Sequence, residues 1–308
     1  MDAAPHRTVV ISGASGLIGT RLVALLRAEG CEVRRLVRRP VSAPQEIRWD
    51  PDTGLLDPAA LAGADAVVHL SGRSIATRWT PRAREEILGS RLRSSRLLAS
   101  ALVSLPASER PAALVQASGI GIYGPRRPGE MLDEDSSTGE GFLADVVRAW
   151  EACARPAADA GIRTVLVRTG MVLSPLGGAL RPQLPLYRLG LGGRMGPAGA
   201  MMSWIGLTDM ARVYAHAVSA AQLHGPVDAV GPRPVTQAEF ARTLGHVLHR
   251  PARLPVPPLG PRLLLGADGT DELILTDQAV SDARLRASGF VPNAIDLESA
   301  LRQELGRA

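Results

Sequence analysis

An apolar segment that runs directly into a glycine-rich turn constrains the fold of this chain more than any other feature. Val9, Val10 and Ile11 form a β-branched run, and the seven residues 13–19, with the sequence GASGLIG, follow it. Apolar residues at helical spacing then continue to Glu29. The pattern predicts a strand, a tight turn and a helix from Thr20 to Glu29. This order begins a dinucleotide-binding βαβ unit.

The glycines of the turn are spaced as GxxGxxG, and each has a role in binding a dinucleotide. We expect Gly13 to permit the turn, Gly16 to let the backbone approach a diphosphate and Gly19 to let the helix pack closely on the strand. The free N–H groups at the beginning of the helix then face the anion. The predicted cofactor-binding residues of this turn are Gly13, Ser15, Gly16, Leu17, Ile18 and Gly19.

Two arginines, Arg38 and Arg39, follow a second predicted strand, Glu32 to Val37. A Rossmann fold carries an acidic residue here when it binds the ribose 2′-hydroxyl of NAD, and an arginine accommodates the 2′-phosphate of NADP. Guanidinium groups pair well with phosphate. The sequence therefore favours NADP, or its reduced form NADPH, with a solvated pair of loop arginines as the alternative.

Strands and helices continue to alternate along the chain, which predicts an α/β fold with a Rossmann-type, doubly wound parallel sheet. Ligands of such a sheet bind beyond the C-terminal ends of the strands. We expect His69 to be a core residue of its strand. The further strands are predicted at 47–50, 66–70, 113–117, 164–168 and 226–230, and the helices at 59–63, 81–103 and 142–160. The strand ends add Leu70, Ser71, Gly72, Gly170, Met171 and Val172 to the predicted cofactor site.

The composition changes after the sixth strand, where 174–200 is rich in glycine and proline. We expect a Rossmann domain at 1–175, to which 206–230 returns, and a smaller substrate-side domain at 176–205 and 231–308. Thr208 or Asp209 is predicted to cap one helix, and Thr236 with Glu239 forms a capping box for another. The segment 251–261 is predicted to be an extended crossing. We expect the acidic residues Glu130, Asp133, Glu134 and Asp135 to form a solvated surface loop.

Composition excludes several classes of partner. The net charge is +5 and all 35 basic residues are arginines, scattered among carboxylates with few aromatic residues, whereas a nucleic-acid surface needs a basic stripe with stacking rings. No apolar run is long enough to span a membrane, and Met1 to Arg7 has no signal-peptide core. Cys31 and Cys153 are isolated, so neither a disulfide framework nor a metal site is expected. These features predict a cytoplasmic protein with a small-molecule substrate.

Several short motifs together resemble one group of proteins. The chain resembles the atypical short-chain dehydrogenases/reductases called epimerase family proteins, which end in a segment of the DUF1731 type. This resemblance implies an NADP-binding Rossmann fold with a small C-terminal part on the substrate side. The matching residues are 13–19, 78–80, 90–91, 118–124, 168–170, 190–193, 203–205, 250–251 and 289–290.

The resemblance also locates the chemistry. Standard members of the superfamily use Ser, Tyr and Lys, with the last two spaced as YxxxK. Ser118 occupies the serine position, but the YxxxK position, within 142–147, contains neither Tyr nor Lys, and the chain has no lysine at all. Arginine cannot easily replace lysine in tuning a proton relay. We therefore expect Ser118 and Tyr123 to be the catalytic residues, with a packing or substrate-wall role as the alternative for Tyr123. Asp145 and His69 are further candidates for the acid or base.

Arg91 stands where the superfamily usually has asparagine, and we place it in the cofactor site. Tyr187, Arg194 and Trp204 are predicted to contact the substrate, and either Arg194 or Arg91 to meet an anionic group on it.

Two functions stay open. The chain is an NADP-dependent oxidoreductase or nucleotide-sugar-epimerase-like enzyme with a non-standard active site, or an NADP-binding regulatory protein without activity, for example one linked to cell division. A homodimer through the long helices is the expected assembly by analogy.

Overall fold

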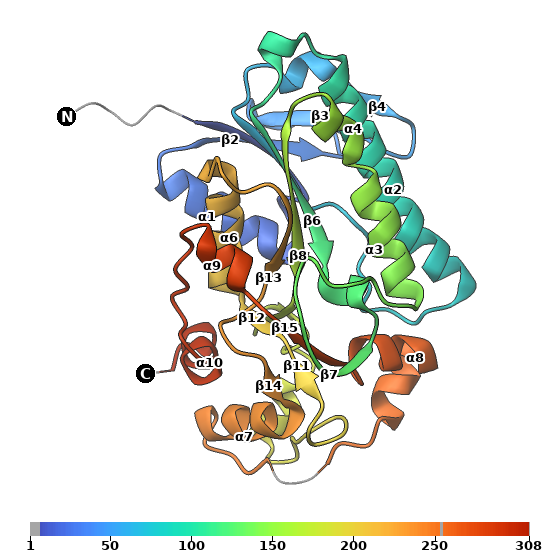
Figure 1. The fold of residues 1–308 in the computed structure, drawn as a ribbon, viewed down its shortest axis with the longest axis vertical. Helices are drawn as coiled ribbons and strands as arrows, with labels where there is room; N and C mark the ends of the chain where they lie inside the picture. Colours follow the sequence, from blue (N-terminus) through green and yellow to red (C-terminus); the bar gives the residue numbers. More distant parts are fainter. Residues whose placement is uncertain (1–6, 253–254, 308) are drawn as a thin grey trace, which may run out of the picture.

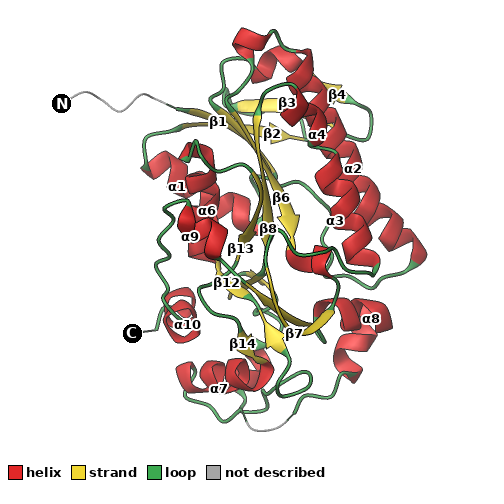
Figure 2. Cartoon of the chain, viewed as in Figure 1, coloured by secondary structure: helices red, strands yellow, loops and turns green. Residues whose placement is uncertain are grey.

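The computed structural model describes residues 7–252 and 255–307 around one eight-stranded sheet (Figures 1 and 2). Residues 1–6, within the segment tested above for a signal-peptide core, and 253–254, within the predicted crossing, lie outside this description. The strand order is β13-β8-β6-β5-β1-β2-β3-β4, and only the β3–β4 pair is antiparallel. The strands are β1 (Thr8–Ser12), β2 (Glu32–Val37), β3 (Glu46–Asp50), β4 (Leu55–Leu56), β5 (Ala66–His69), β6 (Ala113–Gly119), β8 (Arg163–Thr169) and β13 (Gly225–Ala229).

Helices cover both faces of the sheet, so the predicted Rossmann-type, doubly wound fold is confirmed. Successive side chains of a strand point to opposite faces. Accordingly Val9 and Ile11 of β1 pack in one apolar cluster with α1, α6 and α9, whereas Val10 packs in another with α2 and α4. The helices of the first face are α1 (Leu17–Ala28), α6 (Leu207–Ser219) and α9 (Ala283–Ala287), and those of the second are α2 (Pro81–Ser104), α3 (Phe142–Ala152) and α4 (Arg155–Asp159).

A smaller region lies below the C-terminal ends of the strands in the view of Figure 1. It has an apolar cluster of its own, which includes Tyr187, Trp204 and Phe240. Its strands pair in three small sheets, β10-β9-β12, β11-β14 and β15-β7. These elements are β7 (Arg126–Leu132), β9 (Met171–Ser174), β10 (Gly177–Gly178), β11 (Met201–Met202), β12 (Trp204–Gly206), β14 (Val235–Thr236), β15 (Asp277–Val280), α5 (Leu184–Arg188), α7 (Gln237–Val247), α8 (Leu259–Leu273) and α10 (Leu297–Leu305).

Short 3-10 turns complete the described elements, at η1 (Pro58–Leu61), η2 (Ala107–Glu109) and η3 (Ile120–Tyr123). Two predicted helix starts are confirmed by their caps. Thr80 accepts a hydrogen bond from the N–H of Ala83, and Thr236 accepts one from the N–H of Glu239. Among residues 7–252 and 255–307, no helix combines the length and apolar character that crossing a membrane requires.

Four expectations about local structure were wrong. Helix α1 begins at Leu17 rather than Thr20, with Gly16 as its N-cap. The segment 142–160 forms two helices, and Pro156 lies in the first turn of the second, where its missing N–H costs nothing. Gly206, and neither Thr208 nor Asp209, is the N-cap of α6.

The fourth error concerns the acidic segment, which is only partly a solvated loop. Residues 126–132 form β7, which pairs with β15 near the C-terminus of the chain. The Glu134 side chain is 4% exposed and accepts a hydrogen bond from the backbone N–H of Asp228. A pairing between segments so far apart in the sequence has no local pattern that could predict it.

Candidate functional site

The glycine-rich turn lies where β1 is flanked by β2 on one side and β5 on the other, the switch point at which ligands bind to such sheets. Gly13 has φ +69°, and a Cβ on it would lie 2.8 Å from the carbonyl carbon of Leu70. A Cβ on Gly19 would lie 2.2 Å from the carbonyl oxygen of Gly13. Gly16 donates its N–H to that same oxygen at 2.9 Å. The turn is therefore a cradle that side chains would fill.

The beginning of α1 leaves this cradle open to a ligand. Ser15 and Gly16 are exposed, and Leu17 and Ile18 are half-buried in the first turn of the helix. The first N–H groups of a helix have no partner within it and favour an anion. These residues therefore fit a diphosphate.

The end of β8 and the strand after it lie beside the same turn. Gly170 donates its N–H to Ala229 at 3.1 Å, and Met171 donates to Ser203 at 2.9 Å. A Cβ on Gly178 would lie 2.8 Å from the carbonyl oxygen of Val172 and 3.7 Å from Cδ2 of Leu17. The structure thus places Val172 near Leu17 of the glycine-rich turn, and Gly170 and Met171 immediately precede it in the chain.

Arg38 and Arg39 differ in their surroundings although they are adjacent. Arg39 donates from Nη1 to Oε2 of Glu46 at 2.8 Å, and Glu46 also accepts from Arg35 at 2.9 Å. The Arg39 hydrogen bond is the main reason that the pKa of Glu46 is lowered to about 2. Arg38 is exposed at the end of β2 and makes no hydrogen bond or ion pair with any residue that the structure describes. Of these two arginines, Arg38 is therefore the one whose guanidinium could meet a 2′-phosphate without giving up a partner among the described residues.

Arg91 of α2 lies beneath the loop that follows β5. A Cβ on Gly72 would lie 3.3 Å from Cζ of Arg91, and the guanidinium lies 4.9 Å from the centre of the Trp150 ring. Its Nη1 donates to the carbonyl oxygens of Arg73 at 2.9 Å and Ile87 at 3.0 Å. Arg91 therefore joins the predicted rim residues Leu70, Ser71 and Gly72.

His69 is a buried member of a hydroxyl network rather than a residue of the rim. Its ring nitrogens lie 2.6 Å from Oγ of Ser12 and 3.1 Å from Oγ of Ser95, which also accepts from Trp150. Burial, assisted by the charge of Arg91, lowers the pKa of His69 to about 3. His69 is therefore neutral, in keeping with a core histidine.

Ser118 and Tyr123 lie in one buried polar network whose other members were not predicted as site residues. Ser118 donates to Oε1 of Glu151 at 2.5 Å. Arg168 donates to both oxygens of Glu151, at 2.9 and 3.0 Å, and to the Tyr123 hydroxyl at 3.0 Å. Tyr123 donates to Oδ2 of Asp228 at 2.7 Å. An arginine at the end of a strand beside a glutamate in the covering helix was the signal that could have found the pair.

Burial controls the protonation of this network. The Tyr123 and Asp228 side chains are fully buried, and Oδ1 of Asp228 has no partner among the described residues. Burial, with the nearby Glu134, raises the pKa of Asp228 to about 8. Burial and the charge of Asp228 raise the pKa of Tyr123 well above its ordinary value. In this geometry the Tyr123 hydroxyl is committed to Asp228 and is not open to a substrate.

The position expected for the Tyr–Lys pair is occupied by apolar packing. Phe142, Leu143 and Val146 lie in a cluster with Trp79, and the Phe142 and Trp79 rings meet edge to face at 5.0 Å. Asp145 is exposed and pairs with Arg148. The N–H groups of Phe142 and Leu143 at the beginning of α3 donate to the two carboxylate oxygens of Glu272, at 3.0 and 2.8 Å.

The three predicted substrate residues are not gathered around an open space. Tyr187 and Trp204 are each 2% exposed within the core of the smaller region. The Tyr187 hydroxyl donates to Gly193 at 3.1 Å, and the Trp204 indole donates to Arg233 at 3.0 Å. Arg194 is half-buried and donates to the carbonyl oxygen of Gly196. Contact between these side chains and a substrate stays a prediction.

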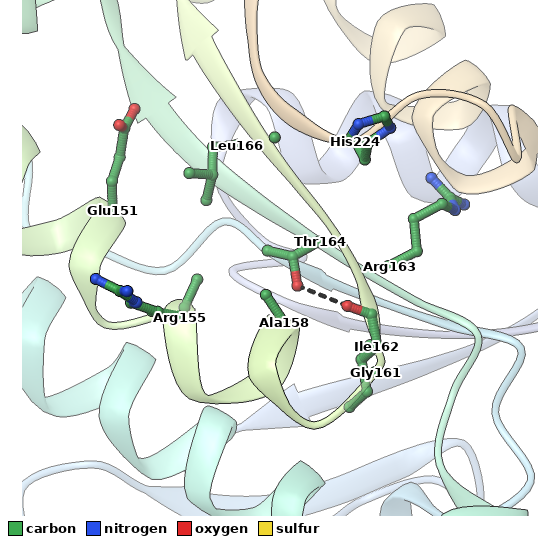
Figure 3. A pocket seen from close by; sticks show the side chains of 11 residues that line it. Glu151, Arg155, Ala158, Gly161, Ile162, Arg163, Thr164, Leu166 and His224 are labelled. Carbon is green, nitrogen blue, oxygen red and sulfur yellow. Dashed lines mark hydrogen bonds between the residues drawn. The ribbon is translucent and has the colours of Figure 1, made fainter.

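A cavity of about 560 Å³ lies at the β13 edge of the large sheet, between α4, the edge strand β13 and its neighbour β8 (Figure 3). Glu151, Arg155 and His224 are among its lining residues, and Thr164 on its floor donates to the Ile162 carbonyl oxygen at 3.0 Å. A second cavity, of about 490 Å³, lies beside Tyr123 and the beginning of α3. Neither cavity is lined by the glycine-rich turn.

The fold and the cradle at its switch point define the chain as a Rossmann-type dinucleotide-binding protein. Residues 9–227 match the model of the NAD dependent epimerase/dehydratase family, and residues 256–304 match a domain of unknown function, DUF1731. The chain belongs to the NAD dependent epimerase/dehydratase family, among the atypical short-chain dehydrogenases/reductases called epimerase family proteins.

Relatives resemble the chain over nearly its whole length. The human epimerase family protein SDR39U1 is 37% identical over 299 residues, which cover 96% of this chain and 98% of the relative. An epimerase family protein of Mycobacterium bovis is 41% identical over 286 residues, covering 92% and 93%.

Two solved structures show the same architecture. The crystal structure of human SDR39U1 (isoform 2) with NADPH has a TM-score of 0.89 at 36% identity, covering 98% of this chain and all of the other. The nucleoside-diphosphate sugar epimerase of Corynebacterium glutamicum has a TM-score of 0.81 at 32% identity, covering 98% of this chain and 58% of the other.

Proposed function

We propose that this chain binds NADPH across the C-terminal ends of β1, β5 and β8. The observation that carries the proposal is the cradle at Gly13 and Gly19, where a Cβ would lie 2.8 and 2.2 Å from backbone atoms. The human SDR39U1 structure, which contains NADPH, supports the choice of cofactor. In this proposal the beginning of α1 holds the diphosphate, and Arg38 holds the 2′-phosphate.

The nicotinamide half of the cofactor then lies over β5, β6 and β8. We assign its surroundings to the loop 70–72, Arg91, Ser118 and the segment 170–172. When bound, the nicotinamide supplies or accepts a hydride. Of the two predicted catalytic residues, Ser118 is the better placed, because it lies near the end of β6. We assign Tyr123 to positioning, because its hydroxyl joins Arg168 to Asp228.

We propose an NADP-dependent oxidoreductase or nucleotide-sugar-epimerase-like enzyme, with 176–205 and 231–308 as the substrate-side region. The family of the chain and the name of the Corynebacterium relative support this reading. Because the chain has no lysine, the proton transfer does not use the standard Tyr–Lys pair. The apolar packing of Phe142, Leu143 and Val146 supports the same point.

The same observation favours a second candidate, an NADPH-binding regulatory protein without catalytic activity. A site without the standard acid and base can keep its cofactor cradle, because the glycines of the turn do not depend on the side chains of α3.

Two measurements test the proposal. NADPH binding is followed by fluorescence titration of the purified chain and of the Gly19→Ala variant, whose methyl group collides with the carbonyl oxygen of Gly13. Gly199→Ala is the matched control, because a Cβ there would meet nothing within 4 Å. We expect binding to be lost in the first variant and kept in the second. No binding by the wild-type chain would overturn both candidate functions.

Activity separates the two candidates. The wild-type chain is incubated with NADPH and a panel of carbonyl compounds, and oxidation of NADPH is followed. Oxidation that the Ser118→Ala variant lacks supports the enzyme. Tight NADPH binding with no oxidation across the panel supports the regulatory protein.

A further inference from the structure

The loop 70–72 connects the glycine-rich turn to Arg91: Leu70 lies against Gly13, and Gly72 lies against the Arg91 side chain. A Cβ on Gly13 would touch the carbonyl group of Leu70, at 2.8 Å from the carbon and 2.9 Å from the oxygen. Two residues further on, a Cβ on Gly72 would lie 3.3 Å from Cζ and 3.6 Å from Nε of Arg91. Arg91 therefore lies at the same switch point as the cradle, on the β5 side of it.

The Arg91 guanidinium is only partly satisfied by the protein. A guanidinium has five N–H donors. Nη1 uses its two on the carbonyl oxygens of Arg73 and Ile87, while Nε and Nη2 have no acceptor among the described residues. Neither nitrogen is among the buried atoms that lack a partner, so both reach solvent. Three donors of one half-buried side chain thus have no acceptor among the described residues.

Structural arginines in this chain look different. Arg110 donates from Nε, Nη1 and Nη2 to the carbonyl oxygens of Leu105, Ala160 and Val103. Arg163 likewise donates to three carbonyl oxygens at the end of α6 and just beyond it. Both tie segments together with every terminal nitrogen. The incomplete bonding of Arg91 is therefore not the pattern of an arginine that only holds the fold.

The charge of Arg91 is also uncompensated. No carboxylate of the described residues lies within ion-pair distance of it, and its flat face rests on the Trp150 ring. Burial lowers the pKa of Arg91 to about 10. In contrast, Arg168 pairs with Glu151. The hydrogen bonds to Glu151 outweigh the effect of burial and raise the pKa of Arg168. A half-buried cation without a partner gains strongly from binding an anion.

We propose that Arg91 binds a carboxylate or phosphate group of the substrate, so that the substrate is a small anionic molecule. This inference rests on the proposed binding of NADPH at the same strand ends. The cofactor diphosphate is the other possible source of an anion, but it belongs to the beginning of α1. That helix lies on the opposite face of the sheet from α2, which carries Arg91.

The test uses the NADPH-loaded chain with oxalate and inorganic phosphate as probes. Binding of each anion is measured from the shift in the thermal midpoint and the change in NADPH fluorescence. We expect Arg91→Gln to weaken anion binding by about tenfold or more and to weaken NADPH binding by much less. Arg82→Gln on the same helix is the control, because its side chain is 88% exposed. It should bind both ligands as the wild type does.

Gly72→Ala provides a second variant that keeps the charge. Its φ is not positive, so alanine is allowed, and the new methyl group would cover Nε of Arg91. We expect it too to weaken anion binding. Absence of anion binding by the NADPH-loaded wild type would overturn the inference while leaving the cofactor proposal intact. A loss of NADPH affinity in Arg91→Gln, with anion binding unchanged, would assign Arg91 to the cofactor diphosphate and would also overturn it.

Discussion

The Arg168 guanidinium at the end of β8 holds both carboxylate oxygens of Glu151 on α3, at 2.9 and 3.0 Å, with the two side chains only 7% and 12% exposed. This pair ties the C-terminal end of α3 to the end of β8. It also holds Ser118 and Tyr123, which hydrogen-bond to Glu151 and Arg168 respectively. The candidate catalytic residues therefore depend on a pair that neither the glycine-rich turn nor the YxxxK position involves.

Removing Glu151 should destabilise the fold strongly. We expect Glu151→Ala to lower the free energy of unfolding by about 3–5 kcal/mol, because it leaves the buried guanidinium unpaired. Urea denaturation measures the change. Glu32→Ala, which breaks an exposed pair with Arg34, should cost less than about 1 kcal/mol. Equal costs for the two variants would contradict this account.

Asp228 should make stability depend on pH. Its pKa of about 8 in the fold lies above the ordinary value of 3.8, so between these values the folded chain binds the proton more tightly than the unfolded chain. The contribution to stability is therefore full below about pH 4 and is lost as the pH rises to about 8. Asp228→Asn cannot lose a proton, so its stability relative to the wild type should increase across this range.

Urea denaturation of the wild type and of Asp228→Asn at several pH values checks this expectation. The groups that face Asp228 are Tyr123, Arg168, Glu134 and Glu151, and all stay in place in the variant. A difference in stability that does not change with pH would show that Asp228 has an ordinary pKa.

Arg38 and Arg39 should contribute unequally to the choice of cofactor. We expect Arg38→Ala to weaken NADPH binding by about tenfold and to leave NADH binding unchanged, because only a 2′-phosphate uses the free guanidinium. Arg39→Ala should have a smaller effect, because Glu46 already holds that side chain. Fluorescence titration with both cofactors measures the ratio. Equal affinity of the wild type for NADPH and NADH would remove the role assigned to Arg38.

The link between α8 and α3 gives a fourth prediction. Glu272 caps α3 by accepting from Phe142 and Leu143, and we expect Glu272→Ala to cost about 0.5–2 kcal/mol of stability. Hydrogen exchange at these two amides should become faster. Asp271→Ala is the control, because that carboxylate lies 3.9 Å from Arg126 in an exposed pair. Unchanged exchange at Phe142 and Leu143 would mean that the cap does not hold the helix end.

The sequence predicted the parts of the site that are made by adjacent residues. The stretch 8–19 contains a strand, the glycines and the first residues of α1, so its geometry follows from local pattern and from the steric needs of glycine. The order of alternating strands and helices was sufficient for the sheet and for the rim at its strand ends. The prediction that His69 is a core residue of its strand is also confirmed, because its side chain is fully buried.

Only the tertiary structure decided which side chains meet across the sheet. Glu151 and Asp228 come from a helix and an edge strand, and burial in a common interior gives Asp228 its raised pKa. Among the described residues, Arg39 is paired and Arg38 is not, because Glu46 of the neighbouring strand β3 binds Arg39. The sequence by itself located the cradle, because the positive φ of Gly13 and the contact of Gly19 with Gly13 are local, whereas the approach of Leu70 to Gly13 depends on the sheet. Tertiary packing determined which charges are free to bind a ligand, because a charge is free only where no distant partner reaches it.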